Sequence, residues 1–270
     1  MKYVPIKYHR RCYTDFYVGK ESDEIRETRP EDDPRTTLVT RKNQKDLSGE
    51  EKNLFMSVID ELVQSGQYNI HVNHHPVMSH RMHGLMSGFI GYERFLYWHR
   101  VFLLKLEGMM RAIDQRVFIP YWNWVDDREF PEWLKDFTPT GLTDLDGDML
   151  PVTRNPGANG ITLPTRLRVD EILSLPDWSS FVRQLEDGPH NRVHRWVGGR
   201  MNDIFYSPAD PVFWLHHAEV DRIWHIWQLA HSGLGTTITG ADAVLDPWAE
   251  STTELEVIAT LGYSYQEETL

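Results

Sequence analysis

Two stretches of sequence indicate the fold: His190-Asn-Arg-Val-His194 and the later run Asp210-Pro-Val-Phe-Trp-Leu-His-His217. His190 and His194 are four residues apart, so a helix places both imidazoles on one face. His217 lies in a strongly apolar run, and an imidazole that faces a protein core needs partners for its ring nitrogens. Two histidines from one helix and a third from an apolar helix predict a metal site with three nitrogen ligands.

The histidines are clustered along the chain. Six of the 13 lie between His71 and His99 and six between His190 and His231, whereas residues 100–189 contain none. A single pair at helical spacing is commonly a surface feature, but two dense clusters far apart in sequence are not. We therefore expect two half-sites that fold against each other.

Length and composition favour a globular protein and exclude some partners. The chain has 270 residues, of which 40% are hydrophobic and 25% charged. Its net charge of −12 argues against nucleic acid and anionic membrane surfaces as partners. A single cysteine, Cys12, excludes a disulfide framework within the chain. Residues 1–11 lack the apolar stretch of a signal peptide, and no apolar run reaches about 18 residues. We expect a cytoplasmic location without membrane spans, although export with a partner protein stays open.

The spacing of apolar residues predicts four main helices. The first begins after Ser48, with Glu51 at the capping-box position, and ends near Ser65. The other three are expected over residues 95–113, 190–197 and 211–230. Shorter elements are a weak edge strand within 1–17, a loop over 20–46, helices over 165–173 and 178–186, and a strand through 263–265.

Four helices with one apolar face each predict a mainly α protein around a four-helix bundle, with a few short peripheral β-strands. Bundle cores commonly hold metal pairs. Imidazole suits copper, zinc, iron and nickel, so the residue types alone leave the metal open. We expect one domain over residues 1–270, divided into an N-terminal strand and loop (1–46), a first half-site (47–125), a surface excursion (126–186), a second half-site (187–231) and a closing tail (232–270).

These motifs resemble the type-3 copper family, which comprises tyrosinases, catechol oxidases and the oxygen-binding units of molluscan haemocyanins. The segments 190–199 and 210–222 are similar to its second copper signature, in which the second histidine of the pair is the ligand. Phe95-Leu-Tyr-Trp-His-Arg100, with Glu107 downstream, resembles the first signature. Two further segments, Ile119-Pro-Tyr-Trp-Asn-Trp124 and Tyr263-Ser-Tyr265, resemble the aromatic turn and the closing tyrosine motif of the family.

The resemblance implies two copper ions as cofactors. One is held by His190, His194 and His217, and the other by His99 with two upstream histidines. The upstream pair departs from the family pattern, because Ile90 occupies the position nine residues before His99.

The upstream ligands are assigned by local similarity. His83 is followed by a glycine, as the usual ligand is, and we choose it. Counting onward from Ser65-Gly-Gln-Tyr68, which resembles the bacterial run before the first ligand, leads to His75. His71, His74 and His80 remain alternatives.

The resemblance also implies groups that act on a substrate. In tyrosinases a glutamate and an asparagine hold a water that takes the proton of the phenol. Asn191 directly follows His190, as required, and Glu186 lies in a segment similar to the one that carries the glutamate. Substrate contacts are implied for Arg195, which faces incoming substrate, for Phe213, which stacks over the copper pocket, and for Ile204, which lines it.

The implied activity is the dioxygen-dependent oxidation of phenols. Monophenols would be hydroxylated at the ortho position and o-diphenols oxidised to o-quinones. A catechol oxidase without monophenolase activity, an o-aminophenol oxidase and a haemocyanin-like oxygen carrier are the alternatives, and the carrier is disfavoured because the chain lacks repeated units. The expected partners are a small phenol and dioxygen, and the sequence leaves open a copper-delivery partner and the oligomeric state.

Overall fold

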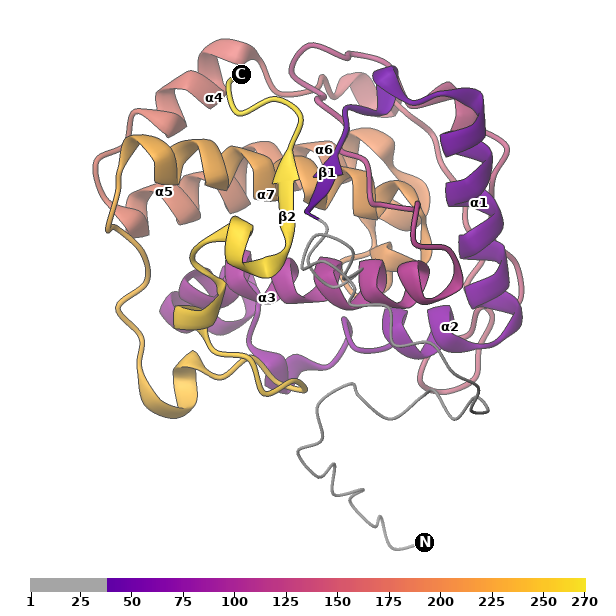
Figure 1. The fold of residues 1–270 in the computed structure, drawn as a ribbon, viewed down its shortest axis with the longest axis horizontal. Helices are drawn as coiled ribbons and strands as arrows, with labels where there is room; N and C mark the ends of the chain where they lie inside the picture. Colours follow the sequence, from indigo (N-terminus) through magenta and orange to yellow (C-terminus); the bar gives the residue numbers. More distant parts are fainter. Residues whose placement is uncertain (1–37) are drawn as a thin grey trace, which may run out of the picture. The chain divides into compact units, whose positions relative to one another are not determined.

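The computed structural model describes residues 38–270, and these form one unit that is mainly helical (Figure 1). The predicted fold class is confirmed. The strand expected within residues 1–17 and most of the loop expected over 20–46 lie outside the described residues. The helices are α1 (Gly49–Gln64), α2 (Gln67–Val72), α3 (Gly84–Ile113), α4 (Arg166–Leu173), α5 (Trp178–Leu185), α6 (Asn191–Val197) and α7 (Val212–Ala230), and the strands are β1 (Val39–Arg41) and β2 (Tyr263–Tyr265).

Short 3-10 helices fill the connections between these elements. They cover Gln44–Asp46, Met78–His80, Glu132–Leu134, Ala158–Gly160, Gly199–Asn202, Ser207–Ala209, Gly240–Ala243, Thr252–Leu255 and Ile258–Leu261. No helix within residues 38–270 combines the length and the apolar character needed to cross a bilayer.

The start of α1 follows the predicted capping box. The Ser48 hydroxyl accepts a hydrogen bond from the Glu51 backbone N–H at 3.1 Å, and the Glu51 carboxylate accepts one from the Ser48 N–H at 2.8 Å. Both contacts satisfy backbone donors that the first helical turn leaves free. Phe55, Ile59 and Leu62 lie on the buried face, which packs against α2 and α3.

α3 and α7 pack against each other through the centre of the unit. α7 agrees with its predicted range and is buried along nearly its whole length, from Val212 to Trp224. α3 is longer than predicted, because it begins at Gly84 rather than near residue 95. Gly88 introduces a kink into this added segment. Its φ of 59° and ψ of −138° are not helical and suit a residue without a Cβ.

α5 belongs to the core, which corrects the interpretation of residues 126–186 as a surface excursion. Its Trp178 and Phe181 are buried, and the Phe181 ring stacks on Trp227 of α7 with centroids 4.5 Å apart. The helix also packs on α3. Its four buried positions recur at helical spacing, so the segment forms one wall of the core rather than a cover.

α5 continues into α6 through a π-helical turn over Glu186–His190. Pro189 lies inside this turn. Proline lacks the N–H that an α-helix needs and its ring displaces the carbonyl four residues earlier, so a widened turn is a physically expected solution. The helix predicted over residues 190–197 therefore begins at the end of this turn. His190 is the last residue of the π-helical turn, and α6 follows from Asn191.

β1 and β2 form a two-stranded parallel sheet, with Val39 opposite Tyr263. The expected loop over 20–46 thus contains a strand, which its charged composition did not indicate. Beneath the sheet, Arg41 donates to Glu107 of α3 at 3.0 and 3.2 Å, and Tyr265 donates to Asp221 of α7 at 2.6 Å. This network connects the sheet to both central helices.

Candidate metal centre

The first histidine cluster consists of His75, His83 and His99. His75 lies just after α2, His83 is the N-cap of α3, and His99 lies in the middle of α3. The Nε2 atom of His75 is 3.4 Å from the Nε2 atoms of both His83 and His99. Three imidazoles from two segments thus point at one place.

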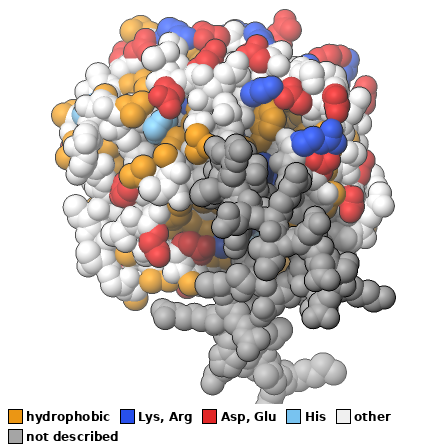
Figure 2. Space-filling view, in the orientation of Figure 1, with side chains coloured by type: hydrophobic (Ala, Val, Ile, Leu, Met, Phe, Trp, Pro, Cys, Tyr) orange, Lys and Arg blue, Asp and Glu red, His pale blue; other side chains and the backbone are white. Residues whose placement is uncertain are grey.

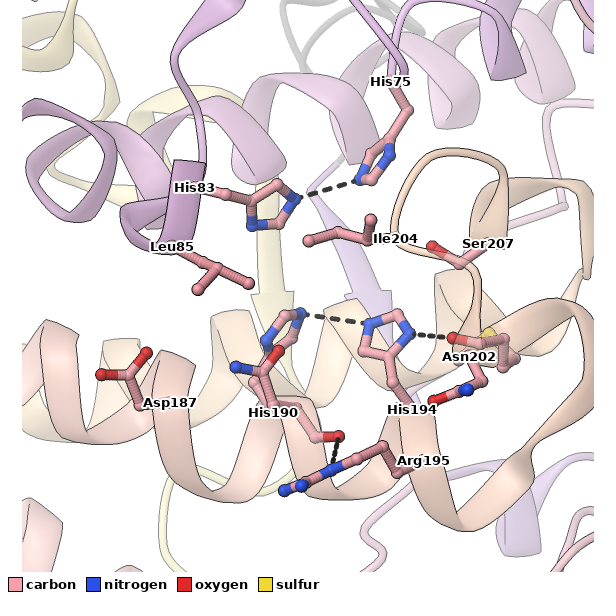
Figure 3. Close-up of a pocket in the computed structure, with 12 residues that line it drawn as sticks. His75, His83, Leu85, Asp187, His190, His194, Arg195, Asn202, Ile204 and Ser207 are labelled. Carbon is pink, nitrogen blue, oxygen red and sulfur yellow. Dashed lines mark hydrogen bonds between the residues drawn. The ribbon is translucent and has the colours of Figure 1, made fainter. Parts of the chain in front are cut away.

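The second cluster contains His190, His194 and His217. His190 comes from the π-helical turn, His194 from α6 and His217 from α7. His194 Nε2 lies 3.1 Å from His190 Nε2 and 3.4 Å from His217 Nε2. Figure 3 shows His190 and His194 on one side of a pocket, with His75 and His83 on the other.

The outer ring nitrogens fix how these imidazoles are oriented. A backbone carbonyl accepts from Nδ1 in four of them: Phe205 for His75 (3.0 Å), Phe95 for His99 (2.8 Å), Glu186 for His190 (3.3 Å) and Met201 for His194 (2.7 Å). Carbonyls only accept, so the proton is on Nδ1 and the lone pair is on Nε2. Hydrogen bonds of this kind are usual behind metal-binding histidines.

The converging lone pairs fit a metal ion. Neighbouring Nε2 atoms carry no proton between them, so they repel each other unless a cation lies in their midst. An imidazole nitrogen binds zinc at about 2.0–2.1 Å, and tetrahedral angles at an ion of that size separate two nitrogens by about 3.3–3.4 Å. The observed separations of 3.1–3.4 Å agree with this geometry.

The electrostatic environment keeps five of these imidazoles neutral. Burial lowers the pKa of His75, His99, His190 and His217 well below the usual value, and neighbouring imidazoles lower it further. Burial also lowers the pKa of His194 to about 4. These residues are therefore free of a competing proton near pH 7, as metal binding requires.

The two clusters adjoin each other. The rings of His99 and His217 stack with centroids 4.4 Å apart, and those of His83 and His190 are 6.1 Å apart. Two ions held by these clusters would be close neighbours, facing the same pocket. The two half-sites expected from the sequence are thus brought together.

Three alternative histidines lie outside both clusters. His71 contacts the Phe102 carbonyl through Nε2 at 3.0 Å, which uses the atom a metal would need. His80 stacks on Trp98 with centroids 5.9 Å apart, and His74 is half-buried beside Trp248. The structure therefore groups His75 and His83 with His99, in preference to these three.

Glu186 contacts the first cluster. Its Oε1 atom lies 3.1 Å from His83 Nδ1 and accepts a hydrogen bond from the Gly84 N–H at 3.0 Å. Burial raises the pKa of Glu186, although the His83 ring opposes the shift. Sequence reasoning placed this residue beside Asn191 and missed the contact with His83, because the two residues are 103 positions apart.

The pocket above the clusters has a volume of about 290 Å³. Asn191, Arg195 and Ile204 line it, as expected for two substrate contacts and one catalytic group. Phe213 does not line it; its ring stacks on His217 with centroids 4.1 Å apart and so supports that imidazole from behind. Leu85, which sequence analysis did not single out, is highly exposed at the mouth.

His216 adjoins the second cluster. Its ring is parallel to that of His190, with centroids 5.3 Å apart, and one of its nitrogens lies within 4.8 Å of the donor atoms of His190, His194 and His217. Among the described residues neither of its ring nitrogens has a hydrogen-bond partner. The sequence indicates this proximity, because His216 directly precedes the predicted ligand His217 in the chain.

Comparison with known proteins identifies the family. A model of the common central domain of tyrosinase matches residues 65–147 and 151–230, which is more than half of the chain.

The chain belongs to the tyrosinase family.

Bacterial tyrosinases are similar to this chain over most of their length. Tyrosinase of Streptomyces antibioticus is 33% identical over 84% of this chain and 99% of the relative. Tyrosinase of Streptomyces galbus is 35% identical over 75% of this chain and 88% of the relative. The chain is thus a tyrosinase-family enzyme, and the resemblance inferred from its motifs is confirmed.

The fold extends to more distant proteins. A functional unit of octopus haemocyanin superposes with a TM-score of 0.65 at 22% identity, covering 86% of this chain and 69% of that one. At this identity the likeness concerns the fold alone.

Proposed function

We propose that this tyrosinase-family protein is a dicopper phenol oxidase, which hydroxylates monophenols at the ortho position and oxidises o-diphenols to o-quinones. The observation that carries the proposal is the pair of imidazole clusters, with inward Nε2 atoms, beside one open pocket. The ligands are His75, His83 and His99 for one ion, and His190, His194 and His217 for the other. Imidazole ligands suit copper, and the family relationship favours it over zinc.

Copper bound at both clusters would supply the electron transfer between phenol and dioxygen. The protein contributes pre-oriented ligands, because Nδ1 of every ligand except His217 is already hydrogen-bonded before an ion arrives. Phe213 supports the His217 ring, the Glu186 carboxylate holds His83, and hydrogen-bonded carbonyls fix the other four. Little rearrangement is then needed when the ions bind.

The pocket residues would position the ring and its proton. Ile204 and Leu85 offer apolar contacts for a flat ring near the histidines. Asn191 reaches the pocket next to His190, and we propose that it holds the water that receives the phenol proton. Glu186 lies behind His83 with a raised pKa, and it would accept the proton through that water or hold His83 in place.

Metal analysis tests the centre directly. Copper-loaded protein is expected to hold two copper ions per chain. Replacement of His194 by Ala should remove one ion, whereas His74→Ala, which alters a half-buried histidine outside both clusters, should leave two. One zinc per chain after exposure to both metals would refute the proposal.

A parallel assay of tyrosine, a catechol and an o-aminophenol tests the activity. We expect oxygen uptake with tyrosine and with the catechol. Oxidation of the catechol alone would indicate a catechol oxidase, and preference for the aminophenol would indicate an aminophenol oxidase. Reversible oxygen binding without turnover of any of the three would indicate a carrier.

A further inference from the structure

A second cavity adjoins the substrate pocket. Its volume is about 460 Å³, and Asp187 and Arg195 line both cavities. The second cavity extends away from the histidines between the segment 162–168 and the start of α6. A ligand in the pocket could therefore continue into it past Arg195.

Three arginines line this cavity, in a chain whose net charge is −12. Arg192 and Arg195 are three residues apart on α6 and so share a face, while Arg168 comes from α4. Within the described part of the chain the cavity has one acidic lining residue, Asp187. Its carboxylate accepts a hydrogen bond from the Tyr92 hydroxyl at 2.9 Å and lies 3.7 Å from Arg183. We call the cavity lined by Arg168, Arg192 and Arg195 the arginine groove.

The positive charges of the groove are only partly compensated. Arg192 donates to the carbonyl and to the hydroxyl of Thr162, two neutral oxygens that anchor it without cancelling its charge. Arg195 donates to the Asn191 carbonyl at 3.2 Å, again a neutral partner. Among residues 38–270, Arg168 is the one of the three that pairs with a carboxylate, that of Glu171 at 3.1 Å.

We infer that the arginine groove binds a carboxylate-bearing arm of the phenolic substrate. The inference rests on the proposed function and names its substrate class: phenols whose ring carries an extended anionic substituent. Guanidinium groups recognise carboxylates through paired, charge-assisted hydrogen bonds. A short arm meets Arg195 at the rim, and a longer arm also meets Arg192 and Arg168.

Matched substrates separate charge from size. Acetyl-Tyr-Glu-amide and acetyl-Tyr-Gln-amide differ by one negative charge on an extended arm, and 3-(4-hydroxyphenyl)propionate and its amide differ by the same charge on a short arm. We expect wild-type copper-loaded protein to oxidise the Glu peptide with a KM about 3–10-fold lower than the Gln peptide. The difference should shrink at high salt, because the groove is exposed.

Arginine variants test which side chains cause the difference in KM between the charged and the neutral substrates. In Arg168→Gln/Arg192→Gln the KM ratio of the two peptides should fall to about the ratio of the short acid and its amide, because Arg195 remains. The ratio for the short pair itself should not change. Arg116→Gln, which removes an exposed arginine outside the groove, serves as the control and should keep both ratios. A peptide ratio near one in the wild type, or an unchanged ratio in the double variant, would overturn the inference.

A binding experiment without copper keeps this test separate from the proposed function. Acetyl-Phe-Glu-amide and acetyl-Phe-Gln-amide cannot be hydroxylated as phenols, and their affinity for metal-free protein can be measured by NMR titration. We expect tighter binding of the Glu peptide, and a smaller difference between the two peptides in the double variant. If the copper-loaded protein oxidises no phenol, the proposed function fails, yet this comparison still decides whether the groove selects carboxylates.

Discussion

At the scale of single residues, Asn191 and Glu186 lie in different places beside the clusters. Asn191 lines the pocket, whereas Glu186 contacts His83. Asn191→Ala should lower the monophenol-to-diphenol rate ratio at least about 10-fold, since general-base catalysis typically contributes about 10²–10⁴-fold. The ratio and the copper content are measured on the same samples, and the copper content should not change.

Glu186→Ala should behave differently from Asn191→Ala. Loss of a partner behind a metal-binding histidine typically costs about 10–100-fold in metal affinity, so the first cluster should bind copper more weakly. Glu186→Gln keeps an acceptor for His83 and provides the matched comparison. If Glu186→Ala and Glu186→Gln both bind copper as tightly as the wild type, Glu186 does not support His83.

Gly91 is a second residue on which the first cluster depends. A Cβ on Gly91 would lie 2.1 Å from the His83 carbonyl oxygen, so Gly91→Ala must displace the backbone that carries His83. We expect this variant to lose one copper ion while it keeps the other. Gly108→Ala, in the same helix with no atom within 4 Å of the new Cβ, should keep both ions and gain about 0.5–1 kcal/mol of helix stability.

At the scale of elements, Asp221 joins the central helices to the terminal sheet. It accepts from Arg100 of α3 at 2.6 Å and from the hydroxyls of Tyr263 and Tyr265 at 2.7 and 2.6 Å. Burial would raise the pKa of Asp221, but Arg100 and Arg41 hold it below its usual range. The carboxylate is therefore the acceptor on which several buried donors depend.

Removal of that acceptor should be costly. Asp221→Ala leaves Arg100 buried without its carboxylate, and breaking a buried ion pair in this way typically costs about 3–5 kcal/mol. Urea denaturation of the metal-free protein measures the change. Asp170→Ala, an exposed acidic residue of α4, is the control and should leave the midpoint near that of the wild type.

Elements with local signals could be predicted from the sequence. The capping box at Ser48 and the helical spacing of His190 and His194 involve residues within one or two turns of each other, so the pattern alone places them. The segment between α2 and α3 has no such period. His75 and His83 were chosen there by similarity to a family motif, and the structure gives the reason they converge: Gly84, Gly88 and Gly91 let the chain fold back on α3.

Contacts between distant segments could not be predicted. Nothing near Val39 in the sequence indicates that it pairs with Tyr263, and the apolar face of α5 does not reveal which helix it covers. The link between Glu186 and His83 is of the same kind. Such features depend on tertiary packing, which a pattern within one segment does not encode.

At the scale of the whole molecule, the buried histidines make stability depend on pH. Burial lowers the pKa of His71 to about 3 and those of His80 and His194 to about 4, against a usual value of about 6.5. In the unfolded chain these groups gain protons below pH 6.5, whereas in the folded chain they stay neutral. Their contribution is therefore complete above about pH 6.5 and is lost as the pH falls towards 4 and 3.

The metal-free protein should accordingly lose stability on acidification. Each such histidine contributes a slope of up to about 1.4 kcal/mol per pH unit. Buried Glu186 and Glu219, whose pKa values burial raises, oppose the trend but are fewer. Urea midpoints at pH 7.5, 6.5, 5.5 and 4.5 should be nearly constant over the first step and then fall; a constant midpoint down to pH 4.5 would contradict this account.

The pairing of β1 with β2 has a consequence for the timing of synthesis. Arg41 and Tyr265 meet across 224 residues of sequence, and ribosomes add about 5–20 residues per second, so the first waits roughly 10–45 s for the second. For most of that interval Arg41 has neither Tyr265 nor Asp221, and α3 has no α7 to cover it. The second histidine cluster takes His217 from α7, so metal loading at that cluster has to follow release of α7 from the ribosome.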